Sequence, residues 1–254
     1  MSNSSVNPAS QDPRDEIFAK PLEQITDFNF GKETAAVFDD MLDRSVPFYG
    51  EIQRMISELA ADFAKSDSAV YDLGCSTCNT FLQIAPYLPP DARPRFVGLD
   101  SSQEMLDKAR SKLMRAGFNY DYDLRMADLN EGVVLEEASV AIMTLTLQFL
   151  RPMRREPLVK SIYDGLRHQG ALIIVEKVLG EDSTFNRLFI KHYYEMKRRN
   201  GYSDLEIAQK REALENVLIP YHHHENVELL RSVGFNHVDV FFKWYNFCGF
   251  MAIK

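Results

Sequence analysis

The sequence lacks the features of a membrane protein and of a fold stabilised by disulfide bonds. Its 3 cysteines, Cys75, Cys78 and Cys248, form an odd set without the spacing of a disulfide framework. No apolar run reaches the roughly 18 residues that a membrane helix needs, and residues 1–20 lack the apolar centre of a signal peptide. We therefore expect a cytoplasmic protein with no membrane partner.

An excess of positive charge is also missing. The chain has 29 Lys and Arg residues against 37 Asp and Glu residues, a formal net charge of -8. Proteins that grip a phosphate backbone normally present a basic surface. The charge balance favours a small-molecule ligand and predicts no direct binding of nucleic acid.

What the sequence does contain is a regular alternation of strand-like and helical segments. The strand-like runs are 69–73, 96–99, 122–126, 140–147 and 171–175. Helical segments between them indicate βαβ crossovers and a parallel sheet, whereas the runs 238–244 and 247–253 indicate an antiparallel pair. The prediction is a Rossmann-like α/β fold with a mostly parallel seven-stranded sheet, an antiparallel C-terminal strand, and helices on both faces.

The domain organisation predicted from composition is simple. Residues 1–15 are rich in Ser, Asn and Pro, which favours a disordered tail. Residues 16–254 are predicted to form a single α/β domain. Within it, the polar segment 181–217 is expected to be a helical insertion over the sheet.

Small and acidic residues follow the first three predicted strands. Gly74 closely follows the first strand, Asp100 ends the second, and Asp128 follows the third. A glycine there is often only a turn, and an aspartate often only a helix cap. At the carboxyl edge of one parallel sheet, however, the three together indicate a nucleotide site in which Asp100 accepts hydrogen bonds from a ribose.

The glycine motif itself is incomplete. Ser76 and Cys78 stand where a G-x-G-x-x-G fingerprint needs glycines, and no P-loop sequence is present. The turn resembles the D-x-G-x-G-x-G signature of class I S-adenosylmethionine-dependent methyltransferases, matched at Asp72 and Gly74. Because Cys78 replaces a glycine, we expect its side chain to crowd the ligand or to require φ < 0.

A closer resemblance extends over about residues 16–254. The matching segments are RSVPFY at 44–49, YDLGCS at 71–76, TLQFL at 146–150, GYSDLEI at 201–207 and QKREALENV at 209–217. Taken in order, they resemble the carboxy-S-adenosyl-L-methionine synthases. The resemblance implies a homodimer that uses S-adenosylmethionine as substrate and prephenate as co-substrate. The implied products are carboxy-S-adenosylmethionine, phenylpyruvate and water, and the first serves modification of the tRNA wobble uridine.

The same resemblance implies a role for individual residues of this sequence. They are Tyr49 at the ligand, Gly74, Cys75 and Ser76 at its methionine part, Asp100 and Ser101 at the ribose, Asp128 and Leu129 at the adenine, and Arg211 at the new carboxylate. A guanidinium can meet a carboxylate with two charge-assisted hydrogen bonds. The alternative for Arg211 is a surface residue paired with Glu215 or Glu206. Thr144 stands where related sequences often carry Asn, and it still offers a hydroxyl.

Other interpretations remain open. The chain can be an ordinary methyltransferase acting on a small molecule or tRNA, or a protein that binds S-adenosylmethionine without catalysis. Cys75 and Cys78 form a C-x-x-C pair, and 222–224 is a histidine tract, but neither has the further ligands of a known metal motif. A solvated helix start is the preferred interpretation of the histidines, and no metal is expected.

Overall fold

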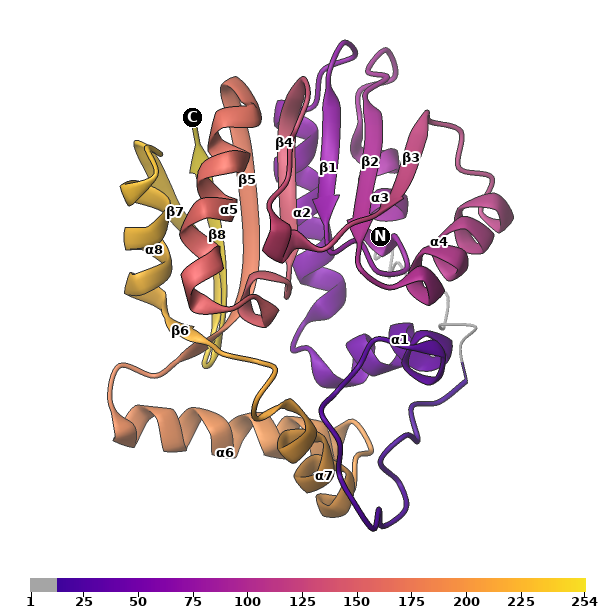
Figure 1. Ribbon diagram of the computed structural model, residues 1–254, viewed down its shortest axis with the longest axis vertical. Helices are drawn as coiled ribbons and strands as arrows, with labels where there is room; N and C mark the ends of the chain where they lie inside the picture. The colour runs from indigo at the N-terminus through magenta and orange to yellow at the C-terminus, as the bar shows by residue number, and fades with distance from the viewer. Residues whose placement is uncertain (1–12) are drawn as a thin grey trace, which may run out of the picture.

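The computed structural model describes residues 13–254, which are built around one central sheet (Figure 1). The strands are β1 (Ala69–Leu73), β2 (Arg95–Asp100), β3 (Tyr122–Met126), β4 (Ala138–Thr144), β5 (Leu166–Leu179), β6 (Tyr221–His222), β7 (His237–Trp244) and β8 (Phe247–Ile253). Their order is β3-β2-β1-β4-β5-β8-β7, with the short β6 pairing to β5. Only β8 runs against its neighbours β5 and β7. The predicted fold class is confirmed.

Helices cover both faces of this sheet (Figure 1). They are α1 (Lys32–Ser45), α2 (Tyr49–Phe63), α3 (Asn79–Ile84), α4 (Gln103–Arg115), α5 (Pro152–Gly165), α6 (Ser183–Arg199), α7 (Asp204–Leu214) and α8 (His223–Ser232). α2, α3 and α4 pack on one face, and α5 and α8 pack on the other. Side chains of a strand alternate between faces, so Val70 of β1 packs toward α2 while Tyr71 and Leu73 pack toward α5.

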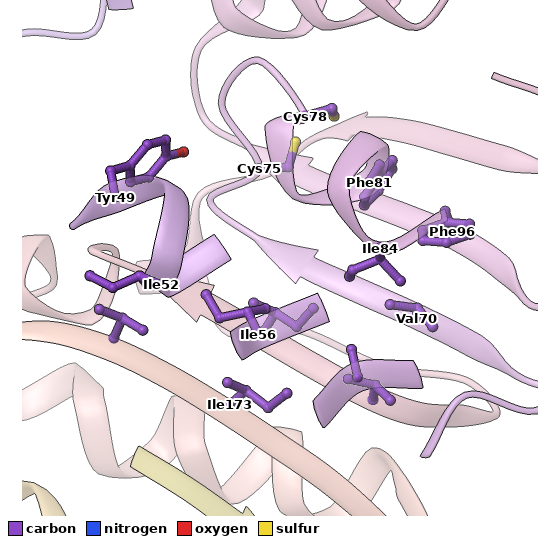
Figure 2. Close-up of a cluster of buried hydrophobic side chains, with 14 of the residues drawn as sticks. Tyr49, Ile52, Ile56, Val70, Cys75, Cys78, Phe81, Ile84, Phe96 and Ile173 are labelled. Atoms are coloured by element: carbon purple, nitrogen blue, oxygen red, sulfur yellow. The ribbon is translucent and has the colours of Figure 1, made fainter. Parts of the chain in front are cut away.

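The hydrophobic core on the α2 face of the sheet fixes the start of α2 near the carboxyl ends of the strands. Ile52 and Ile56, one helical turn apart, are fully buried with Phe81 of α3 and Val70 of β1. Figure 2 shows Tyr49 beyond Ile52, where the same helix begins. Because these apolar contacts fix α2, the first turn of the helix has a defined position at the carboxyl edge of the sheet.

The inserted segment does contain helices, but it does not lie over a face of the sheet. α6 and α7 cross below the carboxyl ends of the strands, beside α1 (Figure 1). The start of α6 is fixed by Asp182, whose Oδ1 accepts hydrogen bonds from the backbone N–H of Thr184 and Phe185. α7 starts at a capping box between Ser203 and Glu206.

Arg14 and Asp15, which the sequence places in the disordered tail, make defined contacts with the rest of the chain. Residues 1–12 of the predicted tail lie outside the described residues, but Arg14 donates a hydrogen bond to the carbonyl of Gly201 at 3.0 Å. Asp15 is buried, and its Oδ2 accepts a hydrogen bond from the Tyr202 hydroxyl at 2.7 Å. The predicted boundary at residue 15 is therefore too late. Within residues 13–254, no helix is long and apolar enough to cross a membrane.

Candidate functional site

A cavity of about 360 Å³ opens at the carboxyl ends of β1, β2 and β4. Its wall contains every residue predicted for the site except Arg211: Tyr49, Gly74, Cys75, Ser76, Asp100, Ser101, Asp128, Leu129 and Thr144. Tyr49 begins α2, whereas the others end a parallel strand or follow one closely. The strand order changes direction between β1 and β4, because the chain adds β2 and β3 on one side of β1 and β4 and β5 on the other. Open α/β sheets bind their ligands at this topological switch point.

The turn after β1 takes the shape of the glycine motif without most of its glycines. Gly74 has φ +83°, and a Cβ built there would lie 2.4 Å from Thr146 Oγ1. Ser76 and Cys78 adopt left-handed conformations as well, at φ 48° and 58°. The Cys78 side chain is fully buried in the core and is not part of the cavity wall (Figure 2). Both expected consequences of Cys78, crowding of the ligand and a negative φ, are therefore wrong.

Asp100 ties the end of β2 to this turn. Its Oδ2 accepts the backbone N–H of Ser76 and its Oδ1 accepts that of Ser102, each at 2.9 Å. A carboxylate offers about four lone-pair sites, so these two hydrogen bonds leave acceptor capacity for a ligand. Burial raises the pKa of Asp100, but these backbone donors favour its ionised form. The arrangement suits a ribose with two neighbouring hydroxyls.

Two further aspartates lie in the cavity wall. Burial raises the pKa of Asp72 to about 7, although Thr80 donates a hydrogen bond to it. Asp128 is more exposed, and its Oδ1 accepts from the backbone N–H and the side-chain amide of Asn130 at 2.9 Å. The carboxylates give this part of the wall a negative potential that favours a cationic ligand.

The wall contains buried polar atoms that have no hydrogen-bond partner among the described residues, among them those of Gln53 and Thr144. Both amide atoms of Gln53 are buried and unpartnered, and so is the hydroxyl of Thr144. An unsatisfied buried polar group costs about 1–3 kcal/mol, so a ligand is the natural partner for both. The sequence analysis missed Gln53, although it lies one helical turn after Tyr49 on the buried side of α2.

The wall also contains basic side chains. Lys177 of β5 and Lys210 of α7 line the cavity. Burial lowers the pKa of Lys177 to about 8. Neither lysine was predicted as a site residue, because lysine in a strand or a polar helix gives no sequence signal that separates a buried position from an exposed one.

Arg211 does not reach the cavity of its own chain. It is exposed on α7, whereas the preceding residue, Lys210, is buried and lines the cavity. Successive residues of a helix point about 100° apart, so the two side chains cannot face the same way. The predicted contact of Arg211 with the ligand is not made within one chain.

The histidine tract lies outside the cavity, whereas Cys75 of the cysteine pair lines it. His223 and His224 place their Nδ1 atoms 2.6 Å and 3.4 Å from the carboxylate of Glu181. These three side chains are a possible ligand group, with ligand atoms within 4.8 Å of one another, but none lines the cavity. Cys75 and Cys78 are buried free thiols.

Comparison with known proteins agrees with the fold. A family model described as "Methyltransferase domain" matches residues 70–170. Human N-acetylserotonin methyltransferase in complex with SAM aligns over 87% of this chain and 55% of its own, with a TM-score of 0.56 and 15% identity. PigF with SAH aligns over 88% of this chain and 60% of its own, with a TM-score of 0.60 and 17% identity. These likenesses show the fold.

Two relatives are similar along nearly the whole chain. The carboxy-S-adenosyl-L-methionine synthase of Methylococcus capsulatus is 58% identical over 95% of this chain and 99% of its own. The enzyme of the same name from Nitratiruptor sp. is 43% identical over 95% of this chain and 98% of its own. Identity at this level over the full length, together with the methyltransferase fold, shows that the chain belongs to the carboxy-S-adenosyl-L-methionine synthase family.

Proposed function

We propose that the protein converts S-adenosylmethionine and prephenate to carboxy-S-adenosylmethionine, phenylpyruvate and water. The observation that carries the proposal is the near-full-length identity to synthases of that name. The convergence of the predicted ligand residues on one cavity supports it. Its volume of about 360 Å³ falls in the usual range of small-molecule sites.

The proposed binding mode follows from the polar groups of the wall. Asp100 accepts hydrogen bonds from the ribose, and the turn from Gly74 to Ser76 holds the methionine part. Asp128 and Leu129 contact the adenine. The carboxylate side of the cavity attracts the sulfonium, whose positive charge also acidifies its methyl group.

The proposed reaction balances without a protein nucleophile. The sulfonium methyl loses a proton and becomes an ylide, while prephenate releases carbon dioxide and hydroxide and becomes phenylpyruvate. The ylide carbon forms the new bond to carbon dioxide, and the released proton and hydroxide give water. Residues of the chain act by holding the two substrates together and by stabilising charge. The reaction as written needs no metal ion.

The cellular setting is part of the same proposal. The product is a small sulfonium metabolite that a separate enzyme would use on the tRNA wobble uridine, so this chain need not hold tRNA. The net charge of -8 agrees with that division of work. The free thiols of Cys75, Cys78 and Cys248 fit a reducing compartment such as the cytoplasm.

Mass spectrometry of the small molecules tests this proposal. The purified protein is incubated with S-adenosylmethionine and prephenate, and we expect a sulfonium product heavier by one carboxyl group in place of one hydrogen. Formation of S-adenosylhomocysteine instead would support the ordinary methyltransferase. Binding of S-adenosylmethionine without any product would support the non-catalytic alternative.

Gln53→Leu is expected to weaken the binding of S-adenosylmethionine by about tenfold, because the ligand loses a hydrogen-bond partner in a buried place. The melting temperature should stay the same or rise, since leucine leaves no unsatisfied amide. Calorimetric titration and thermal unfolding measure the two quantities. An unchanged dissociation constant would show that Gln53 does not contact the ligand.

We propose that Arg211 acts across a homodimer, because it is exposed and lies outside its own cavity. Arg211→Ala should then lose carboxylated product far more than S-adenosylmethionine binding. Asp100→Ala should be inactive too, yet mixing the two variants under exchange of subunits should restore activity, because one site of each mixed dimer is intact. If mixing restores nothing, or if Arg211→Ala loses binding and product equally, this role of Arg211 is wrong.

A further inference from the structure

Near α6 and α7, three lysines lie against two tyrosine rings, and two of these lysines, Lys177 and Lys210, line the cavity. The Nζ atoms of Lys177 and Lys197 lie 5.1 Å and 5.7 Å from the centre of the Tyr193 ring. The Nζ atoms of Lys197 and Lys210 lie 5.0 Å and 5.5 Å from the centre of the Tyr202 ring. Lys197 therefore shares one ring with each of the other two lysines. We call Lys177, Lys197 and Lys210 the lysine cluster.

The lysine cluster has fewer acidic partners than cations. Lys210 Nζ lies 3.4 Å from Asp15 Oδ2 and 3.2 Å from Ser45 Oγ. For Lys177 and Lys197, no side-chain hydrogen bond or ion pair within residues 13–254 accompanies the ring contacts. Lys197 is nevertheless only 4% exposed.

Other charged groups nearby do not correct this imbalance. Glu206 is engaged by the backbone N–H and hydroxyl of Ser203, each at 2.7 Å, in the capping box of α7. Arg44 adds a further cation 4.0 Å from the centre of the Tyr202 ring, and its ion pair is with Asp40. The region therefore holds a surplus of buried positive charge.

A surplus of this kind opposes folding unless an anion joins it. The contact of an ammonium with an aromatic ring contributes about 0.5–2 kcal/mol, less than the cost of removing the charge from water. The effect is visible in the pKa of Lys197, which burial and then its two lysine neighbours lower to about 7. An anionic ligand placed against these ammonium groups would supply the missing negative charge.

S-adenosylmethionine alone does not suit this part of the wall. Its sulfonium is a cation, and its single carboxylate is balanced by its own ammonium group. The co-substrate of the proposed reaction, in contrast, is a dianion with two carboxylates. Since aspartates and the lysines Lys177 and Lys210 both line the cavity, its wall offers groups of opposite charge to a sulfonium and to a dianion.

We propose that the lysine cluster is the carboxylate subsite for the dianionic co-substrate, an inference that rests on the proposed function. Lys177 and Lys210, which line the cavity, contact the carboxylates. Lys197 strengthens the local positive potential from behind the two tyrosine rings. The cluster selects a dicarboxylate over a monocarboxylate, because only the former satisfies both cavity-lining ammonium groups.

The test separates binding from turnover. The protein is first saturated with S-adenosylhomocysteine, which lacks the reacting methyl group, and prephenate is then titrated calorimetrically. We expect Lys177→Met to raise the dissociation constant of prephenate by at least about tenfold. The dissociation constant of S-adenosylhomocysteine should change by less than about twofold, and the melting temperature should not fall, because an unpaired charge is removed.

Lys191→Met is the matched control, because Lys191 is exposed on α6 and outside the cavity wall. It should leave both dissociation constants unchanged. The inference is overturned if Lys177→Met leaves prephenate binding unchanged, or if it weakens S-adenosylhomocysteine as much, which would place the methionine carboxylate at the lysines.

Succinate and butyrate, titrated in the same way, separate failure of the subsite from failure of the proposed function. If succinate binds better than butyrate and this preference is lost in Lys177→Met, the subsite stands even if no carboxy-S-adenosylmethionine is formed. If Lys177→Met forms carboxy-S-adenosylmethionine with the parent protein's KM for prephenate, the subsite fails and the function stands.

Discussion

Asp100→Ala is expected to weaken the binding of S-adenosylmethionine by about 100-fold or more. The substitution removes the acceptor that we propose for two ribose hydroxyls, and a hydrogen bond to a charged group contributes about 1.5–3 kcal/mol. It also frees the backbone N–H groups of Ser76 and Ser102, which the carboxylate holds at 2.9 Å. Calorimetric titration of the variant against the parent protein gives the ratio of dissociation constants.

Two comparisons make this result specific. Asp100→Asn keeps one acceptor oxygen and should fall between the parent protein and Asp100→Ala. Asp107→Ala removes an exposed carboxylate of α4 that pairs with Arg110, and it should leave the dissociation constant within about twofold. If Asp100→Ala binds as tightly as the parent protein, the ribose does not lie at the end of β2.

Among substitutions that add one methyl group to the cavity wall, Gly74→Ala is expected to reduce stability and ligand binding the most. At φ +83° an alanine is strained by about 1–2 kcal/mol. Its Cβ would also lie 2.4 Å from Thr146 Oγ1 and 2.6 Å from Thr146 Cγ2. Thr146 cannot move away freely, since its backbone N–H donates a hydrogen bond to the buried carboxylate of Glu176 at 3.1 Å.

We expect Gly74→Ala to lower the free energy of unfolding by roughly 2–4 kcal/mol. We also expect it to weaken S-adenosylmethionine binding by at least about tenfold, because the turn or the Thr146 loop must move. Urea unfolding and calorimetry measure the two effects. Gly50→Ala is the control: nothing lies within 4 Å of its added Cβ in α2, and alanine there should stabilise by up to about 1 kcal/mol. Equal behaviour of the two variants would contradict the assigned role of Gly74.

Apart from Tyr49 of α2, the predicted residues that line the cavity are those that the sheet itself brings together. Asp100 and Asp128 are 28 positions apart in the chain, yet Asp100 ends one strand of the parallel sheet and Asp128 closely follows the next. In such a sheet, all carboxyl ends of the strands share one edge, so strand order alone places these side chains near one another. The alternation of strands and helices was sufficient to predict this.

The remaining parts depend on side-chain direction in polar helices and on contacts between distant segments. α7 is polar on most sides, so its pattern does not tell that Lys210 is buried and Arg211 exposed. Asp15 meets Tyr202 across 187 positions, and no local pattern reports such a contact. Lys177 and Gln53 break the rule that buried positions are apolar, as residues of a ligand site often do.

The origin of the new carboxyl group tests the central claim most directly. Prephenate labelled with ¹³C in the ring-attached carboxyl group is incubated with the protein and unlabelled S-adenosylmethionine, and the sulfonium products are analysed by mass spectrometry. We predict carboxy-S-adenosylmethionine that carries the label next to the former methyl carbon, together with unlabelled phenylpyruvate. Unlabelled carboxy-S-adenosylmethionine, or S-adenosylhomocysteine in its place, would contradict the proposed function.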